Sequence, residues 1–309
     1  MAPNSRRLHP TSSRTLLCAL CVCLVLGLTL SGTEVRARSP PSWSFLKEIA
    51  DEQTRSCSSV WPAAPVERVL VHVCIPTVAR PGGVEYLSST LDSLAYQLDL
   101  AGNKPAWLDG VTVYNMHVPA EEHVTPQRYF ESKRSRRAWL RVRIRNEPVR
   151  EHRVMTHGDG IRRVVWRSKE AQDYELTLQM CMAENPHVTY FAVVQDDVEF
   201  NEGIRDLASW VAQRYSRPAA VCSLSLYDED SATPPNGELR ADNMVARVWE
   251  RSRAADFANY IYERYDVDPV DWLARSFCKR KRKPTRVMVP NPLSHRGEIS
   301  TLQGKVWSL

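Results

Sequence analysis

The sequence lacks most of the short motifs that would assign a function directly. It has no Cys-x-x-Cys pair and no Cys/His cluster at zinc-ligand spacing, which argues against the common zinc modules. It has no Asn-x-Ser/Thr acceptor for N-glycosylation. No Gly-x-Gly-x-x-Gly or P-loop pattern follows the first apolar run, which disfavours a dinucleotide oxidoreductase or a P-loop ATPase. A net charge of +5 over 309 residues is too small to imply a nucleic-acid partner.

Long hydrophobic runs are confined to the N-terminus. Residues 15–32 carry no charge, and Arg6, Arg7 and Arg14 precede them. This pattern predicts a secretory signal peptide or a signal-anchor helix, with the bulk of the chain lumenal. Beyond Gly32 no window approaches the roughly 20 apolar residues that a membrane span requires. We expect a short cytoplasmic tail (1–14), a signal-anchor helix (15–32), a stem (33–65) and one folded domain (66–309).

Five of the eight cysteines lie outside the apolar N-terminal segment. A lumenal location permits disulfides, but an odd number leaves at least one cysteine unpaired or intermolecular. Three of the five sit inside apolar runs of strand or helix length, which favours buried free thiols at those positions. The five are Cys57, Cys74, Cys181, Cys222 and Cys278, and the three in apolar runs are Cys74, Cys181 and Cys222.

Apolar runs of strand length alternate with helical periodicity along the folded part. Strands are expected at 68–76, 109–118, 188–195 and 219–227, and helices at 82–98, 168–184, 204–215, 244–265 and 269–277. Ser168 is the expected N-cap of its helix. Residues 119–163 are charged and aperiodic, which indicates a loop. The alternation predicts an α/β domain with a mostly parallel, Rossmann-like central sheet.

Two adjacent carboxylates, Asp196 and Asp197, follow the apolar run at 188–195. Ligands of parallel sheets bind outside the carboxyl ends of the strands, where Pro76 and Thr77 are also expected. Neighbouring carboxylates repel each other unless water or a cation screens them. Aspartate oxygens suit Mg²⁺ or Mn²⁺, which commonly bridges to substrate phosphates. Taken alone, the pair fits either such a metal–diphosphate site or a polar turn.

Two other segments favour the metal–diphosphate interpretation. Arg167 and Lys169 stand at an expected helix start, where backbone N–H groups and basic side chains attract anions. His295 lies in a loop bounded by Pro and Gly, where a packed core imidazole is less expected, and histidine is a frequent metal ligand. Each feature alone also fits a solvated surface.

Six segments together resemble the successive motifs of the N-acetylglucosaminyltransferase IV family, in the family's order. They are HVCIPTVAR, EYLSSTLDSL, VVWRSKEAQDYELTLQMCM, YFAVVQDDVEF, DPVDWLARSF and NPLSHRGEISTLQGK. The resemblance covers roughly residues 69–305, without recognisable similarity at about 119–162. This family transfers GlcNAc from UDP-GlcNAc in β1,4 linkage to the α1,3-arm mannose of N-glycans in the Golgi. The resemblance implies a GT-A fold and an inverting, metal-dependent glycosyltransferase in the Golgi or ER membrane, or a secreted one if residues 15–32 are cleaved.

The resemblance also implies roles for individual residues. Gln195 stands where the family usually has the first acid of a Glu-Asp-Asp triplet, so one negative charge is missing and metal affinity is in question. The implied roles are the uridine and diphosphate pocket for Pro76, Thr77 and Arg80, nucleotide flanks for Arg167, Lys169 and Asp173, the acidic triplet for Gln195, Asp196 and Asp197, and Mn²⁺ (or Mg²⁺) ligands for Asp197 and His295.

Inverting transfer needs a general base that deprotonates the acceptor hydroxyl. Asp271 is the candidate, because its segment matches a family motif and opens a helix. A helix-capping role for Asp271 fits equally well. Asp266, Asp268 and Glu229 are alternative bases.

Two other functions remain open. The Asp-Asp pair and the SHRG segment also resemble the transferase that adds GalNAc to glycosylphosphatidylinositol anchors, although that family carries a transmembrane hairpin in its catalytic domain. A catalytically inactive GT-A domain that acts as a lumenal scaffold is consistent with Gln195. The expected partners of the transferase are a glycan acceptor on a glycoprotein or glycolipid and, through residues 15–32, a membrane.

Overall fold

The computed structural model describes residues 69–100, 102–133, 138–145, 147–152, 157–216, 221–229 and 243–297. The expected tail, signal anchor and stem lie outside this part of the chain, as does Cys57. Within the described ranges, no helix combines the length and the apolar character needed to cross a membrane.

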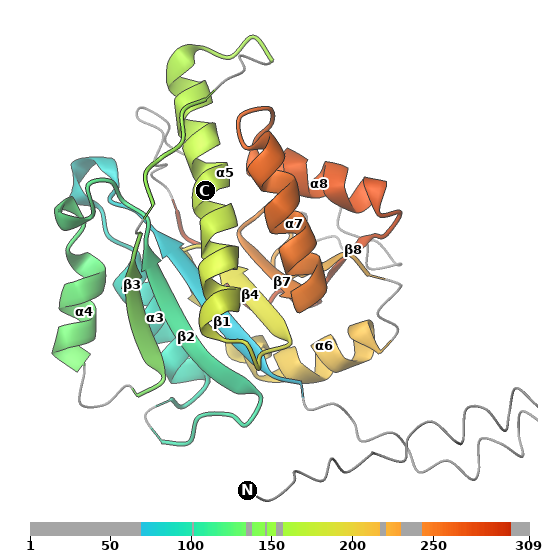
Figure 1. Cartoon of the computed structure of the whole chain (residues 1–309). Coiled ribbons are helices and arrows are strands. Elements are labelled where there is room, and N and C mark those ends of the chain that lie inside the picture. The colour runs from blue at the N-terminus through green and yellow to red at the C-terminus, as the bar shows by residue number, and fades with distance from the viewer. Residues whose placement is uncertain are drawn as a thin grey trace, which may run out of the picture. The chain divides into compact units, whose positions relative to one another are not determined.

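A seven-stranded sheet forms the centre of the fold, in the order β3-β2-β1-β4-β7-β6-β8 (Figure 1). The pairs β3–β2, β2–β1, β1–β4 and β6–β8 are parallel, while β7 pairs antiparallel with both β4 and β6. The predicted mostly parallel α/β sheet is therefore confirmed. The strands are β1 Val71–Thr77, β2 Leu108–Asn115, β3 Leu140–Ile144, β4 Tyr190–Val194, β6 Ser223–Ser225, β7 Ala246–Glu250 and β8 Thr285–Val287.

A separate two-stranded antiparallel ribbon joins β5 (Val198–Phe200) to β9 (Leu293–His295). Its register sets Val198 opposite His295. Because β5 begins one residue after Asp197, the ribbon brings the end of the described chain back to the acidic pair.

Helices cover both faces of the sheet and enclose two apolar cores. Helices α5 and α7 lie across one face, as Figure 1 shows, and pack with α8 in the core that includes Cys74, Phe257 and Phe277. Leucines of α3 and α6 belong to the other core. The helices are α3 Leu87–Gln97, α4 Thr125–Lys133, α5 Ile161–Glu184, α6 Leu207–Tyr215, α7 Arg251–Arg264 and α8 Val270–Arg280, with short 3-10 turns at Pro81–Gly83, Ala120–Glu122 and Glu202–Asp206.

Three of the sequence-based element boundaries are wrong. Helix α5 begins at Ile161 after Gly160, so Ser168 is a buried interior residue and not an N-cap. The expected loop at 119–163 contains α4 and the edge strand β3, whose Leu-Arg-Val-Arg-Ile pattern carries charge because it is only half buried. The expected helix at 244–265 is divided at Glu250, whose carboxylate accepts hydrogen bonds from the N–H groups of Ser252 and Arg253. That cap ends β7 and begins α7 without a glycine or proline to mark the boundary.

The expectation of free thiols is also wrong. Cys74 of β1 is bonded to Cys181 of α5, and Cys222 to Cys278 of α8. Their apolar surroundings had suggested small hydrophobic residues, but the paired cysteines lie with their Cα atoms 6.5 and 5.6 Å apart, which is close enough for both bridges.

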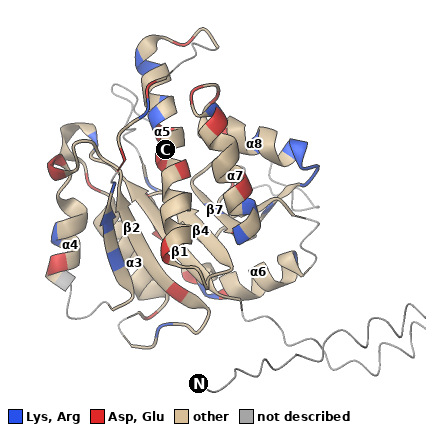
Figure 2. Ribbon diagram, in the orientation of Figure 1, with Lys and Arg blue, Asp and Glu red and all other residues tan. Residues whose placement is uncertain are grey.

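The basic run at 278–284 forms the C-terminal end of α8 and the turn that follows it (Figure 2). Lys279, Arg280 and Lys281 are exposed, and Lys281 Nζ lies 2.7 Å from Asp256 Oδ2. Cations are favoured at a helix C-terminus, so a solvated helix end accounts for this run.

Candidate functional site

The acidic pair and the end of β1 meet at the carboxyl edge of the sheet. Thr77 is the last residue of β1, and Asp196 and Asp197 follow β4, which pairs in parallel with β1. The Thr77 hydroxyl donates a hydrogen bond to Asp196 Oδ2. We call Thr77, Arg80, Asp196, Asp197 and His295 the carboxylate cluster.

Arg80 bridges the two carboxylates. Its Nη1 and Nη2 donate to Asp196 at 3.0 and 2.6 Å, and Nη2 also donates to Asp197 Oδ2 at 2.9 Å. The side chain is only 7% exposed, and its guanidinium lies 4.9 Å from the ring centroid of Tyr86. Burial opposes the charge of Arg80, but the two carboxylates outweigh it and raise the pKa of the guanidinium. The repulsion expected from the sequence is thus relieved by a side chain.

Asp196 is saturated with hydrogen bonds from Arg80 and Thr77. Burial raises the pKa of its carboxyl, and Arg80 opposes that effect. Its backbone is fixed from α3, because the Thr90 hydroxyl lies 2.8 Å from the Asp196 carbonyl oxygen and accepts the Val198 N–H at 3.2 Å. Asp196 therefore holds Arg80 in place and has no oxygen left without a partner.

Asp197 faces His295 across the start of the β5–β9 ribbon. His295 Nε2 lies 3.3 Å from Asp197 Oδ2, and the Arg296 N–H donates to the Asp197 carbonyl at 2.7 Å. Burial alone would raise the pKa of Asp197, but His295 and Arg80 lower it. Burial would likewise lower the pKa of His295, and the hydrogen bond to Asp197 raises it.

The residues around Asp197 fit a divalent metal. Asp197 Oδ1 is buried and has no hydrogen-bond partner among the described residues, although buried carboxylate oxygens normally have one. Gly297 leaves open the space beside Asp197 Oδ2 and His295 Nε2, since a Cβ there would stand 2.9 Å from His295 Nε2 and closer still to Asp197 Oδ2. One carboxylate oxygen and one imidazole nitrogen suit Mn²⁺ or Mg²⁺ that also takes phosphate or water oxygens.

The chain supplies only a part of a metal's coordination shell here. No group of three or more His, Cys, Asp or Glu in the described ranges is arranged to hold a metal ion. Gln195 is half-buried, its backbone N–H bonds to the Val245 carbonyl at 2.8 Å, and it adds no charge. The remaining ligands would therefore come from a substrate or from water.

His123 is a neighbour of the cluster that the motifs did not reveal. Its Nε2 lies 3.0 Å from Thr77 Oγ1, and Asn115 Nδ2 anchors its loop by donating to the His123 carbonyl at 2.9 Å. Burial, with the charges of His117 and Arg80, lowers the pKa of His123 to about 4. It lies within the segment interpreted from the sequence as a loop, where a single histidine carries no pattern.

The basic residues of α5 do not form a helix-start anion site. Lys169 Nζ lies 2.5 Å from Asp173 Oδ2 and donates to the Met116 carbonyl at 2.9 Å, while Arg145 takes the other Asp173 oxygen. Arg167 is fully buried and pairs with Asp159 at 3.5 Å. Because α5 begins at Ile161, these side chains lie in its second and third turns. Met116, whose N–H donates to the Thr77 carbonyl at 2.8 Å, links Lys169 to the end of β1.

The candidate bases occupy different places. Asp271 lies in the first turn of α8, whose N-cap is Pro269, and its Oδ1 accepts the Trp272 N–H at 3.0 Å, which suits an acid of the first turn and not an N-cap. Asp268 pairs with His157 at 2.6 Å, and Asp266 is buried. Glu229 is exposed, and its charge contributes to the raised pKa of His295. Glu229 therefore has an electrostatic link to the carboxylate cluster through His295.

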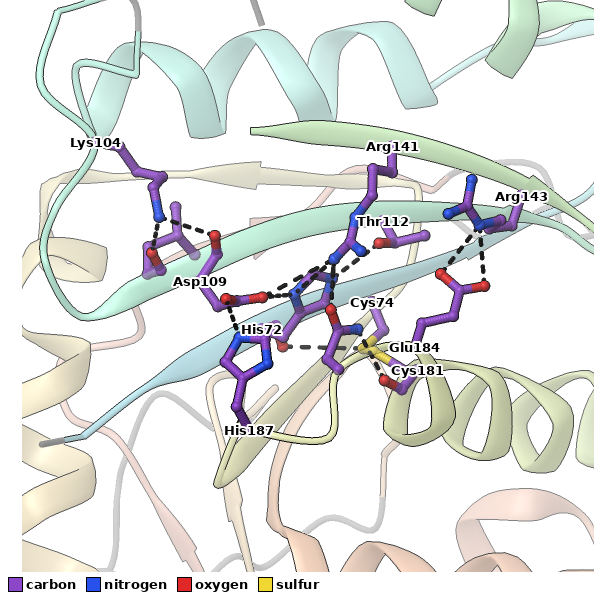
Figure 3. A network of polar contacts seen from close by, with 12 residues as sticks. His72, Cys74, Lys104, Asp109, Thr112, Arg141, Arg143, Cys181, Glu184 and His187 are labelled. Carbon is purple, nitrogen blue, oxygen red and sulfur yellow. Dashed lines mark hydrogen bonds and ion pairs between the residues drawn. A yellow bond between two sulfur atoms is a disulfide. The ribbon is translucent and has the colours of Figure 1, made fainter. Parts of the chain in front are cut away.

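A second polar network lies at the amino ends of the strands, away from the cluster (Figure 3). Asp109 accepts from two histidines, with Oδ2 at 2.6 Å from His72 Nδ1 and Oδ1 at 2.8 Å from His187 Nε2. Arg141 donates to Asn185 Oδ1 at 2.6 Å. His72 is fully buried, and burial lowers its pKa. The network joins β1, β2 and β3 to the end of α5 through groups that satisfy one another, which is the pattern of a structural network.

A hollow of about 530 Å³ lies at the far end of the β5–β9 ribbon. It is lined by Asn201, Glu202, Gly203, Arg205, Asp206, Pro290 and Asn291. The cluster itself contributes no residue to this hollow. We regard the cluster as the better site, because its polar groups converge and the hollow is an open surface depression.

Comparison with known proteins leaves the family open. No protein-family model matches the chain, and no curated protein matches it. The solved structures similar to it include S. aureus TarS 1-349, with 12% identity and a TM-score of 0.41 over 71% of this chain and 57% of that one. The chain thus spans less than two thirds of that structure's length.

A second similar structure is CMP:2-keto-3-deoxy-manno-octonic acid synthetase complexed with CTP, with 9% identity and a TM-score of 0.40 over 71% of this chain and 89% of that one. Neither TM-score is high enough to assign an activity, and the resemblance to the N-acetylglucosaminyltransferase IV family stays a prediction from the sequence.

Proposed function

We propose that this protein is an inverting, metal-dependent glycosyltransferase that moves a sugar, GlcNAc in the first instance, from a UDP-sugar to a glycan acceptor in the secretory pathway. The observation that supports this most is the Asp197–His295 pair at the carboxyl edge of the sheet, with the buried Asp197 Oδ1 left without a partner. Nucleotide ligands of α/β sheets bind at this edge.

Each member of the carboxylate cluster has a role in the proposal. Asp197 and His295 hold the metal, which when bound offsets the negative charge on the UDP leaving group. Asp196 and Thr77 orient Arg80, and Met116 and Lys169 support the end of β1 from the neighbouring strand and helix. These contacts fix the polar groups before a substrate arrives, which lowers the cost of ordering them during the reaction.

Two carboxylates are candidates for the general base. Asp271 is the choice from the motif, and Glu229 is favoured by its electrostatic link to His295. Glu229→Gln and Asp271→Asn separate them, because the true base gives a large loss of turnover while substrate binding is retained.

The test is a donor screen with the purified lumenal part, with UDP release measured with Mn²⁺ and with EDTA. We expect UDP release from UDP-GlcNAc with Mn²⁺, and a loss of about 100-fold or more in Asp197→Asn, since charge stabilisation by a metal contributes several kcal/mol. Asp206→Asn is the matched control, because Asp206 is exposed and makes no side-chain cap hydrogen bond. Equal activity of the two variants would refute the metal role of Asp197.

The same screen discriminates the alternative functions. Release from UDP-GalNAc only, with a glycosylphosphatidylinositol acceptor, would favour the anchor-modifying transferase. Stabilisation by a UDP-sugar without any UDP release would favour a scaffold. A ligand at one hundred times its Kd adds about 2.7 kcal/mol to the free energy of unfolding, which a thermal shift detects.

A further inference from the structure

We propose that Arg80 holds the place of a cation between Asp196 and Asp197, and that a divalent metal binds Asp197 and His295 in competition with this guanidinium. The inference deepens the proposed function, because it concerns the metal site invoked there. It is based on the contacts of Arg80 and on two buried atoms without hydrogen-bond partners among the described residues, Arg80 Nε and Asp197 Oδ1.

The guanidinium stands where a bridging cation would stand. One nitrogen, Nη2, is shared between Asp196 Oδ1 at 2.6 Å and Asp197 Oδ2 at 2.9 Å. Burial makes this pairing strong, because Arg80 and Asp196 are each 7% exposed and Asp197 is 10% exposed in their side chains. One guanidinium thus offsets part of the charge of the acidic pair without any metal.

Two buried atoms in the same cluster have no hydrogen-bond partner among the described residues. They are the acceptor Asp197 Oδ1 and the donor Arg80 Nε. Burying such groups without partners costs free energy, so each indicates a ligand atom that remains to be supplied. A metal satisfies the free oxygen of Asp197, and an anionic oxygen such as that of a phosphate satisfies a guanidinium N–H.

Metal and guanidinium compete because they share one carboxylate. Arg80 and His295 both approach Asp197 Oδ2, so a metal bound between Asp197 and His295 meets the guanidinium at the same carboxylate in a buried place. Their repulsion lowers metal affinity, and any metal that draws Asp197 toward itself weakens the contact with Arg80. Gln195 adds no negative charge that would offset the excess positive charge of the metal and the guanidinium together.

The test is a titration with Mn²⁺ alone, with free Mn²⁺ followed by electron paramagnetic resonance and no nucleotide present. We expect Arg80→Met to bind Mn²⁺ at least 10-fold more tightly than the native protein. Arg143→Met is the matched control, because Arg143 is 44% exposed, pairs with Glu184 outside the cluster and carries the same charge. Its Mn²⁺ affinity should stay within twofold of the native value.

Arg80→Lys is a second variant that tests the same inference if Arg80→Met does not fold. An ammonium keeps the charge but cannot bridge both carboxylates as the planar guanidinium does, so a smaller tightening in the same direction is expected. Mn²⁺ should also raise the Tm of each Arg80 variant more than that of the native protein.

Unchanged or weaker Mn²⁺ binding in the folded Arg80 variants overturns the inference, as does the absence of Mn²⁺ binding in every variant. Tighter binding sustains it even if no donor sugar is ever turned over, since the titration requires no catalysis. The UDP-release screen tests the transferase separately.

Discussion

His123 illustrates how a single side chain outside every recognised motif can matter to the cluster. It contacts Thr77 at 3.0 Å, and its pKa is lowered to about 4 mainly by burial, with further contributions from the charges of His117 and Arg80. The folded protein therefore keeps this imidazole neutral at pH values where the unfolded chain binds a proton. The contact positions Thr77 beside Asp196 at a cost in acid stability.

The acid stability of the protein should depend on His123. Between about pH 6.5 and pH 4 the His123 imidazole binds a proton in the unfolded chain but stays neutral in the folded protein. The free energy of unfolding therefore falls as the pH falls through this window. His123→Gln should show a shallower fall, because glutamine keeps a hydrogen-bonding group near Thr77 and does not titrate. Urea unfolding from pH 7 to pH 4 measures both slopes, and parallel slopes would contradict the prediction.

Gly297 should contribute to metal binding, because it has no side chain beside Asp197 and His295. A methyl group there would intrude on Asp197 Oδ2 and His295 Nε2, so Gly297→Ala should weaken Mn²⁺ binding by about 10-fold or more, equivalent to about 1.4 kcal/mol. Gly160→Ala is the control, because a Cβ at Gly160 meets no atom within 4 Å. Calorimetric titration with Mn²⁺ gives the affinities, and equal values for the two variants would be evidence against the assigned site.

At the scale of elements, a disulfide and several hydrogen bonds hold the C-terminal half of α5 against the sheet. Cys181 is bonded to Cys74 of β1, and Asn185 just beyond the helix accepts from Arg141 of β3. Arg251 at the start of α7 donates to the carbonyls of Met182 at 3.3 Å and Val188 at 2.8 Å. A cation at a helix C-terminus also complements the helix dipole. These anchors fix the helix that carries Lys169 and Asp173.

Removal of the Cys74–Cys181 bridge should destabilise the fold without removing the cluster. The bridge joins residues separated by 107 positions, and bridges of this kind contribute about 2–5 kcal/mol by constraining the unfolded chain. The double variant Cys74→Ala, Cys181→Ala should lower the free energy of unfolding by that amount in urea denaturation. Reductant should lower the free energy of unfolding of the native protein by at least the same amount. An unchanged free energy of unfolding in reductant would show that the bridge contributes nothing to stability.

At the scale of the whole molecule, the sequence predicted the alternation of strands and helices and the mostly parallel sheet, since buried strands and amphipathic helices have distinct periods. It also placed Thr77 and Asp196 at one edge, because strand ends of a parallel sheet meet there. It missed β3 because edge strands are charged, and β7 because Glu250 caps the next helix without a turn residue. The bridging by Arg80 and the two disulfides depend on distances between segments remote in sequence, which periodicity does not encode.

The β5–β9 ribbon, which places His295 beside Asp197, has a consequence for the order in which the carboxylate cluster is assembled during synthesis. The carboxylate cluster takes Thr77 and Arg80 from the first described strand and the turn that follows it, the acidic pair from the middle of the described chain, and His295 from the last described strand. Contacts between such distant segments form late, because long loops must close first. A nascent chain would thus expose the acidic pair and its guanidinium before the imidazole emerges from the ribosome, so the contact between Asp197 and His295 would form only after almost the entire described part of the chain has been synthesised.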